Sequence, residues 1–127
     1  MTPLTIEWIE KAEGDWATAS REMRARKAPN YDAVCFHAQQ CAEKYLKAIL
    51  QEHNLPFPKT HDLVILIELL KAVEPHWMGL KPELRKLTGW AVYLRYPGET
   101  ADQDLAREAM QICRQVRTVA RKSLALK

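Results

Sequence analysis

Residues 31–53 read YDAVCFHAQQCAEKYLKAILQEH, and this stretch decides the fold class. Apolar residues recur in it at spacings of three and four, which is the pattern of one face of an α helix. The apolar stripe consists of Val34, Ala38, Cys41, Tyr45 and Ala48, widened by Cys35, Ala42, Leu46 and Ile49. An arc of this width is able to contact two neighbouring helices. The polar face on the opposite side consists of Gln40, Glu43, Lys44 and Lys47.

The same spacing outside this stretch predicts four more helices, over about residues 5–27, 61–73, 82–94 and 101–124. Asn30 is the expected N-cap of the helix at 31–53, and Thr60 is the expected N-cap of the helix at 61–73. Proline and glycine mark the connections, which are short, and short connections favour antiparallel neighbours. The sequence therefore predicts one domain over residues 1–127, an all-α, up-and-down antiparallel bundle of four or five helices.

The composition limits the class of protein further. The chain has 127 residues, of which 47% are hydrophobic, so its core needs neither disulfides nor a metal for folding. No apolar run reaches the roughly 18 residues of a membrane span, and no signal peptide is visible, so we expect a cytoplasmic protein. Three cysteines without a CxxC spacing indicate buried thiols in a reducing compartment. A net charge of +3 is too small to indicate nucleic-acid binding by itself.

The common catalytic and cofactor motifs are missing: there is no P-loop, GxGxxG, HExxH or GxSxG pattern. His37 and Cys41 have the spacing of two metal ligands on one helix face. Two further ligands are not marked by any spacing, and Cys41 lies in the apolar stripe, so we expect it in the core. The sequence therefore predicts no metal and no cofactor.

Three polar groups admit both a structural and a functional interpretation. Residues 59–63, KTHDL, suit a helix start, but a helix start does not explain His61. Arg95 lies in a turn at the end of the helix at 82–94, where its planar group would suit a phosphate or a carboxylate. Basic residues recur on the last helix, and they form either a solvated face or a contact for an acidic partner or RNA phosphates. These residues are Arg107, Arg114 and Arg121, with Arg117 nearby.

Taken in order, several of these stretches resemble the HEPN domain, named for higher eukaryotes and prokaryotes nucleotide-binding. They are FHAQQCAEKYLKA at 36–48, KTHDL at 59–63 and RYP at 95–97, together with the start at 8–16. The resemblance implies a helical bundle that forms a homodimer, in a small cytoplasmic prokaryotic protein without a membrane segment. It also implies a partner, a separate minimal nucleotidyltransferase, in a two-component module of the toxin–antitoxin type.

The resemblance further implies a site for a nucleotide, an RNA or another substrate, for which Lys59, His61, Arg95 and Tyr96 are the candidates. Tyr93 or Tyr96 would accept a nucleotidyl group from the partner. Many proteins of this family are metal-independent ribonucleases that use an Arg followed four to six residues later by His. No histidine in this chain follows an arginine at that distance. A non-catalytic partner is therefore expected, and the alternative is a divergent ribonuclease toxin that uses Arg95 and His61.

Overall fold

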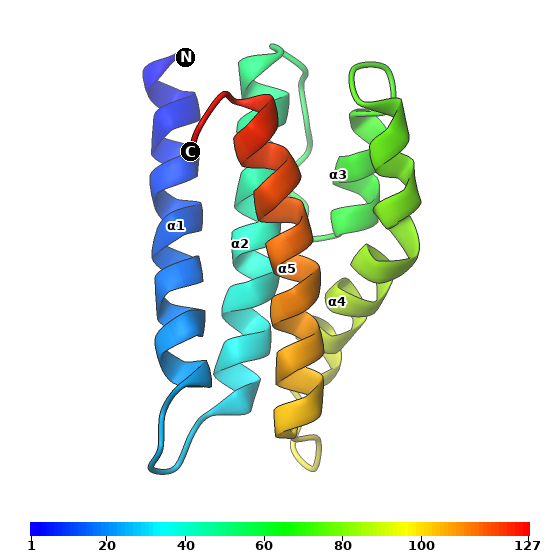
Figure 1. Cartoon of the computed structure of the whole chain (residues 1–127). Coiled ribbons are helices and arrows are strands. Elements are labelled where there is room, and N and C mark those ends of the chain that lie inside the picture. The colour runs from blue at the N-terminus through cyan, green and yellow to red at the C-terminus, as the bar shows by residue number, and fades with distance from the viewer.

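Three long helices lie side by side, and a unit of shorter helices packs against them (Figure 1). The computed structural model describes residues 1–127, and it contains no strand. The helices are α1 (Pro3–Met23), α2 (Tyr31–Glu52), α3 (Leu63–Leu69), η1 (Pro75–Leu80, a 3₁₀ helix), α4 (Lys81–Tyr93) and α5 (Gln103–Ser123). Successive long elements α1, α2, α4 and α5 alternate in direction, which confirms the all-α up-and-down bundle. No helix combines the length and the apolar character that a membrane span requires.

α2 is the central element, because it packs against α1, α3, α4 and α5. Of its 22 residues, 13 are buried, which is more than one face of a helix can supply. Its contacts with α1 and α5 are made largely through small side chains, so the helix axes approach closely. These fully buried small residues are Ala12 and Ala19 on α1, Ala38, Cys41, Ala42 and Ala48 on α2, and Ala106, Ala109, Cys113 and Ala120 on α5.

The three cysteines are free and buried, as expected. Burial raises the pKa of the Cys35 thiol to about 12, and carboxylates at Asp32 and Asp102 add to the effect. A hydrogen bond with Cys113, together with burial, raises the pKa of Cys41 well above its usual value. The thiols of Cys35 and Cys41 therefore stay protonated, and all three buried cysteines pack as small apolar side chains.

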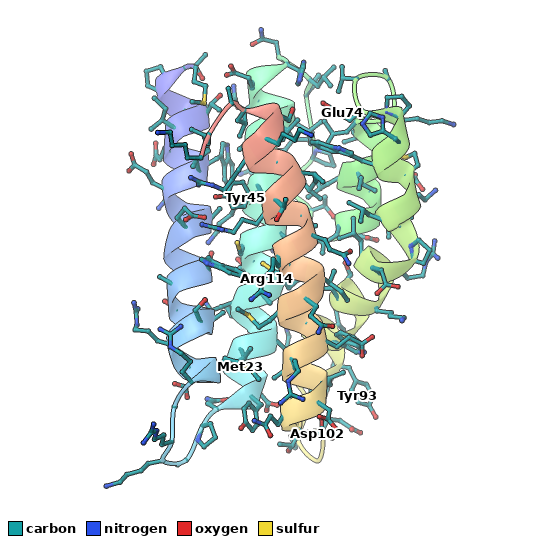
Figure 2. The ribbon with its side chains drawn as sticks, in the orientation of Figure 1. Met23, Tyr45, Glu74, Tyr93, Asp102 and Arg114 are labelled. Carbon is teal, nitrogen blue, oxygen red and sulfur yellow. The ribbon has the colours of Figure 1, made fainter.

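One polar contact joins α1, α2 and α5 (Figure 2). Arg117 on α5 donates two hydrogen bonds of 2.8 Å to the carboxylate of Glu13 on α1. The hydroxyl of Tyr45 on α2 donates to the same carboxylate and accepts a 3.0 Å bond from Nη1 of Arg121. We call Glu13, Tyr45, Arg117 and Arg121 the Glu13 clamp. Arg117 and Arg121 are therefore paired within the fold, which neither interpretation of the basic row on α5 included.

The first predicted helix has different ends in the structure. α1 begins two residues earlier than expected, where Thr2 caps it by accepting a 3.1 Å bond from the amide of Thr5. It ends at Met23, four residues before the predicted end at Lys27. The chain must reverse before α2, and Glu22 accepts a 2.7 Å bond from the amide of Asn30 that closes this turn. Asn30 caps α2 as predicted, by accepting a 3.0 Å bond from the amide of Ala33.

The region after α2 also differs from the prediction. Asp62, not Thr60, caps α3, by accepting a 2.9 Å bond from the amide of Val64. Thr60 instead accepts a 3.1 Å bond from the amide of Asp62, so it stabilises the turn before the cap. α3 covers only residues 63–69, whereas a helix over 61–73 was predicted, and residues 75–80 form a 3₁₀ turn where a loop was expected. Short helices depend on their tertiary contacts, which a periodic pattern does not contain.

We expect the Glu13 clamp to make stability depend on pH. The bonds from Arg117 hold the pKa of Glu13 below its usual value of 4.5, so the charged form favours the folded state. This contribution is present above pH 4.5 and is lost as the pH falls through the lowered pKa. At pH 7, Glu13→Gln should cost about 1 kcal/mol, or roughly 3–5 °C of Tm, because the pair is partly solvated.

The measurement is Tm by circular dichroism at pH 7 and pH 3, with Glu10→Gln as the matched control on the exposed side of α1. The difference between wild type and Glu13→Gln should shrink at pH 3, while the control stays close to wild type at both. A difference that is the same at both pH values contradicts a charged clamp.

Candidate functional site

The side chains that the sequence singles out lie along one edge of α2, in two groups. One group lines a hollow of about 270 Å³ between the start of α2 and the end of α4, which we call the α2–α4 hollow. The other is a polar cluster in the middle of α2, against the segment that leads into α3; we call it the Glu43 cluster. Six residues of helix, or about 9 Å, separate His37 in the hollow from Glu43 in the cluster.

Arg95 is the cation of the α2–α4 hollow. α4 ends at Tyr93 with Leu94 as its C-cap, so Arg95 is the first residue of the turn and its side chain is exposed. Asp32 also lines the hollow, but one of its oxygens accepts a 2.7 Å bond from the amide of Ala101. That bond fixes the turn after α4 to the start of α2. Arg95 itself forms no ion pair, which leaves its five N–H donors free for an anion.

His37 is held in a fixed orientation at the edge of the hollow. Its Nδ1 lies 2.8 Å from Oδ1 of Asp15 on α1, and Nζ of Lys44 lies 2.6 Å from the other oxygen of the same carboxylate. Asp15 is only 9% exposed, and its two carboxylate oxygens act as acceptors, one toward each of these partners. Nδ1 of His37 therefore carries the hydrogen and donates to Asp15. Nε2 has no protein partner, so it is available to accept or donate a hydrogen bond at the hollow.

One phenylalanine lines the α2–α4 hollow, and two tyrosines lie close to Arg95 in the chain. Phe36 lines the hollow, is 40% exposed and meets the ring of His37 edge-on, at 5.2 Å between centroids and 85° between planes. Tyr93 and Tyr96 follow the end of α4 and are 55% and 63% exposed; Figure 2 shows Tyr93 on the outside of α4. A hydrogen bond with Glu99 raises the pKa of the Tyr93 phenol. The hollow thus combines a free guanidinium, a fixed imidazole and accessible rings.

The Glu43 cluster corrects the expectation that this side of α2 is its polar, outward face. Glu43 and Lys47 are 3% and 6% exposed, and Nζ of Lys47 donates a 3.0 Å bond to Oε2 of Glu43. Gln39 is buried too, and its amide donates to Oε1 of Glu43 at 3.2 Å and to the carbonyl of His61 at 2.9 Å. The segment before α3 covers these side chains, and each charge is buried with a partner, as burial requires.

The predicted site residues fall into two places. Arg95, Tyr93 and Tyr96 lie at the end of α4, beside the hollow. His61 lies at the Glu43 cluster, where its Nδ1 is 2.9 Å from Oε1 of Glu43 and its side chain is 69% exposed. Lys59 lies nearby in the chain, is exposed and forms no ion pair. The hollow that holds Arg95 does not include His61, and the histidine placed with Arg95 is His37.

Sequence reasoning did not assign a role in the site to Asp15 or His37. A signal for Asp15 was present, because it lies three residues after Ala12 and four before Ala19, in the buried face of α1. An acid at such a position needs a partner. His37 and Lys44 are seven residues apart on one face of α2, and they are those partners.

His37 and Cys41 do not form a half-site for a metal. Cys41 is fully buried in the core beside Cys113, whereas His37 turns to Asp15. No group of three or more His, Cys, Asp or Glu residues has the arrangement of a metal site. The chemistry of this edge of α2 therefore rests on Arg95, His37 and the aromatic rings.

Comparisons with known proteins agree with this architecture. A family model described as HEPN domain matches residues 5–123. Among solved structures, the crystal structure of an archaeal HEPN homologue matches with a TM-score of 0.70 and 22% identity, over 94% of this chain and 96% of that chain. No curated protein matches the chain.

We expect substitutions at two residues of the Glu43 cluster to have different effects on stability. Glu43→Ala should lower the free energy of unfolding by roughly 3 kcal/mol, because it leaves Lys47 charged, buried and unpaired. His61→Ala should change it by less than about 0.5 kcal/mol, because its ring is mostly solvated. Urea unfolding followed by circular dichroism measures both.

The double variant Glu43→Met/Lys47→Met serves as the control, since replacing both charges with apolar groups of similar length should recover most of the loss. If Glu43→Ala and His61→Ala lowered the free energy of unfolding by the same amount, the result would contradict a buried Glu43–Lys47 pair from which water is excluded.

Proposed function

The chain belongs to the HEPN domain family, and we propose that it acts as the helical, nucleotide- or substrate-binding partner of a minimal nucleotidyltransferase. The two proteins would form a cytoplasmic two-component module of the toxin–antitoxin type, with this chain as a homodimer. The observation that carries the proposal is the α2–α4 hollow, where Arg95 forms no ion pair and lies in the same hollow as the fixed His37.

The hollow suits one part of a nucleotide. A guanidinium with free donors binds phosphate oxygens through two parallel hydrogen bonds. Nε2 of His37 would add one hydrogen bond, and the exposed ring of Phe36 or Tyr96 would stack on a base. A hollow of about 270 Å³ is smaller than most drug-sized sites, so it would hold a phosphate and part of a nucleoside. Lys59 and His61 belong to the segment before α3, which lies beside a later part of α2. There they would contact the remainder of a longer ligand.

The surface around the hollow suits a protein partner. Large apolar side chains are exposed there, and aromatic residues of this kind are enriched at protein interfaces. The residues are Phe36, Val92, Tyr93 and Tyr96. Tyr93 and Tyr96 are accessible to a second enzyme, and either phenol would accept a nucleotidyl group. In that transfer the phenolic oxygen bonds to the α-phosphorus of a nucleoside triphosphate, and diphosphate leaves.

A ribonuclease is the second candidate function, and one observation favours it. Arg95 shares its hollow with an imidazole whose Nε2 is free, namely His37 and not His61. Attack of a ribose 2′-hydroxyl on its phosphodiester needs a proton acceptor and a positive charge near the phosphate, and these two residues supply them. This candidate requires cleavage of a short RNA without metal, abolished in Arg95→Ala and His37→Ala and kept in His61→Ala. RNA that stays intact with the wild-type chain excludes it.

Ligand binding at the hollow is tested by thermal shift with ATP, GTP and a short RNA. A ligand that binds the folded state raises Tm, and near saturation we expect a rise of about 5 °C. Arg95→Ala should remove this rise, because the phosphate contact is lost. Arg85→Ala is the matched control, since Arg85 is exposed on α4, the helix that precedes Arg95, and forms no ion pair. An equal rise in wild type and Arg95→Ala would place the ligand elsewhere.

Partnership is tested by co-expression with the minimal nucleotidyltransferase of the same organism. We expect the two proteins to elute together from a size-exclusion column. With ATP present, the intact mass of this chain should increase by one or more nucleotidyl groups, and the Tyr93→Phe/Tyr96→Phe variant should remain unmodified. Tyr31→Phe controls for the loss of a phenol elsewhere in the chain, at the first residue of α2. Separate elution together with an unchanged mass would refute the partnership.

A further inference from the structure

The basic residues of α5 divide into two groups with different surroundings. Arg117 and Arg121 belong to the Glu13 clamp, and their guanidinium groups are largely covered. Arg107, Arg114 and Lys122 are exposed and turn away from the core. Packing therefore accounts for two of the five cations on this helix and leaves three without a structural role.

The three remaining cations form a continuous polar surface with the amide and hydroxyl side chains between them. We call this surface the α5 strip. Its residues are spaced so that they share one helix face, and all are exposed: Arg107, Gln111, Arg114, Gln115, Thr118 and Lys122. Figure 1 shows α5 at the front of the bundle, with no helix covering its outer side. The strip extends over 15 residues, or about 22 Å.

The acidic side chains that border the strip have partners within the chain. Glu108 lies at the edge of the strip, where its carboxylate is 3.5 Å from Lys86 on α4. Asp104 pairs with Arg107 at 3.1 Å, but its side chain is 88% exposed, so this pair is weak and easily exchanged. At the other end of the strip, Glu74 lies beside Lys122, and its carboxylate accepts a 3.1 Å bond from Ser123.

Two adjoining hollows accompany the strip, and neither is lined by a carboxylate. The first, of about 430 Å³, lies between the end of α1 and α5, and Arg24 joins Arg107 and Arg114 there. The second continues from Gln111 and Arg114 to Thr118. Arg24 and Arg114 form no ion pair; the guanidinium of Arg114 lies over the ring of Trp16, at 5.8 Å from its centroid. Arg24 and Arg114 therefore keep their positive charge without an acidic partner in the chain.

The composition of the strip distinguishes between the polyanions that could bind it. A protein interface is centred on buried apolar or aromatic anchors. None of the large apolar side chains that the chain exposes lies on α5. A phosphodiester backbone needs no such anchor, because guanidinium, ammonium, amide and hydroxyl groups all donate hydrogen bonds to phosphate and sugar oxygens. The strip carries no exposed aromatic ring, so it has nothing on which a base would stack.

We infer that the α5 strip binds the backbone of a single nucleic-acid strand, without reading its bases or its sugar. Its length suits the lower end of the roughly 4–16 nucleotides that single-strand sites occupy. This site is on a different face from the α2–α4 hollow, and the inference goes beyond the proposed function. Binding at the α5 strip does not require Arg95. The inference about the strip therefore stands if the proposed function of the α2–α4 hollow fails, and the proposed function stands if the inference fails.

The test is fluorescence anisotropy of the full chain with 12-nucleotide RNA and DNA strands of the same sequence. Both strands should bind with affinities within about threefold of each other, because backbone contacts ignore the 2′-hydroxyl. The logarithm of the binding constant should fall with the logarithm of salt concentration with a slope of about −2, as three cations on a single strand predict. The variant Arg107→Gln/Arg114→Gln/Lys122→Gln should weaken binding at least about tenfold and flatten this slope.

The control carries the same change of net charge on other surfaces: Lys11→Gln/Lys71→Gln/Arg85→Gln, whose residues are exposed and unpaired. It should bind nearly as well as the wild-type chain. Equal weakening in the control and the strip variant would reduce the effect to net charge and overturn the inference. A 12-residue poly-glutamate peptide that binds as tightly as the strands would also overturn it, in favour of an acidic protein. Unchanged circular dichroism melts establish that the variants are folded.

Discussion

The enclosure of α2 is the constraint on which the rest of the structure depends. α1, α5 and the α3–α4 unit surround this helix, and 13 of its 22 residues are buried. A helix enclosed in this way needs small side chains where neighbours approach and a partner for every polar group that it carries inward. Tyr45 meets Glu13 on one side, and Glu43 meets Lys47 on the other. The first contact joins α2 to α1, whereas the second lies within α2 between residues four positions apart.

The same enclosure shapes the candidate site. Asp15 reaches from α1 to orient His37, which leaves one ring nitrogen free at the α2–α4 hollow. Arg95 reaches the hollow because α4 ends beside the start of α2 and Asp32 holds the following turn. The site is therefore assembled at a junction of three elements, with one charged group that the fold does not neutralise. Such an unpaired cation is costly only when it is buried, and here it is exposed.

Some charged side chains are paired within the fold, and others are exposed and free to contact a ligand. On α5, Arg117 and Arg121 complete the Glu13 clamp, whereas Arg107, Arg114 and Lys122 face outward. Along α2, Lys44 and Lys47 are both paired with acids. Free cations mark both the α2–α4 hollow and the α5 strip, and the two surfaces share no lining residue. The two proposals therefore concern separate sites.

The sequence by itself determined the class of fold, the number of helices and the order of the family motifs. These features depend on apolar spacings of three and four and on the prolines and glycines that end helices. Both can be recognised in the sequence without knowledge of tertiary contacts. Only the tertiary structure decided that Glu43 and Lys47 are buried, because the segment before α3 covers them. It also decided that Arg95 lies with His37 and not with His61. Helix packing, which periodicity does not specify, sets which residues from separate elements meet.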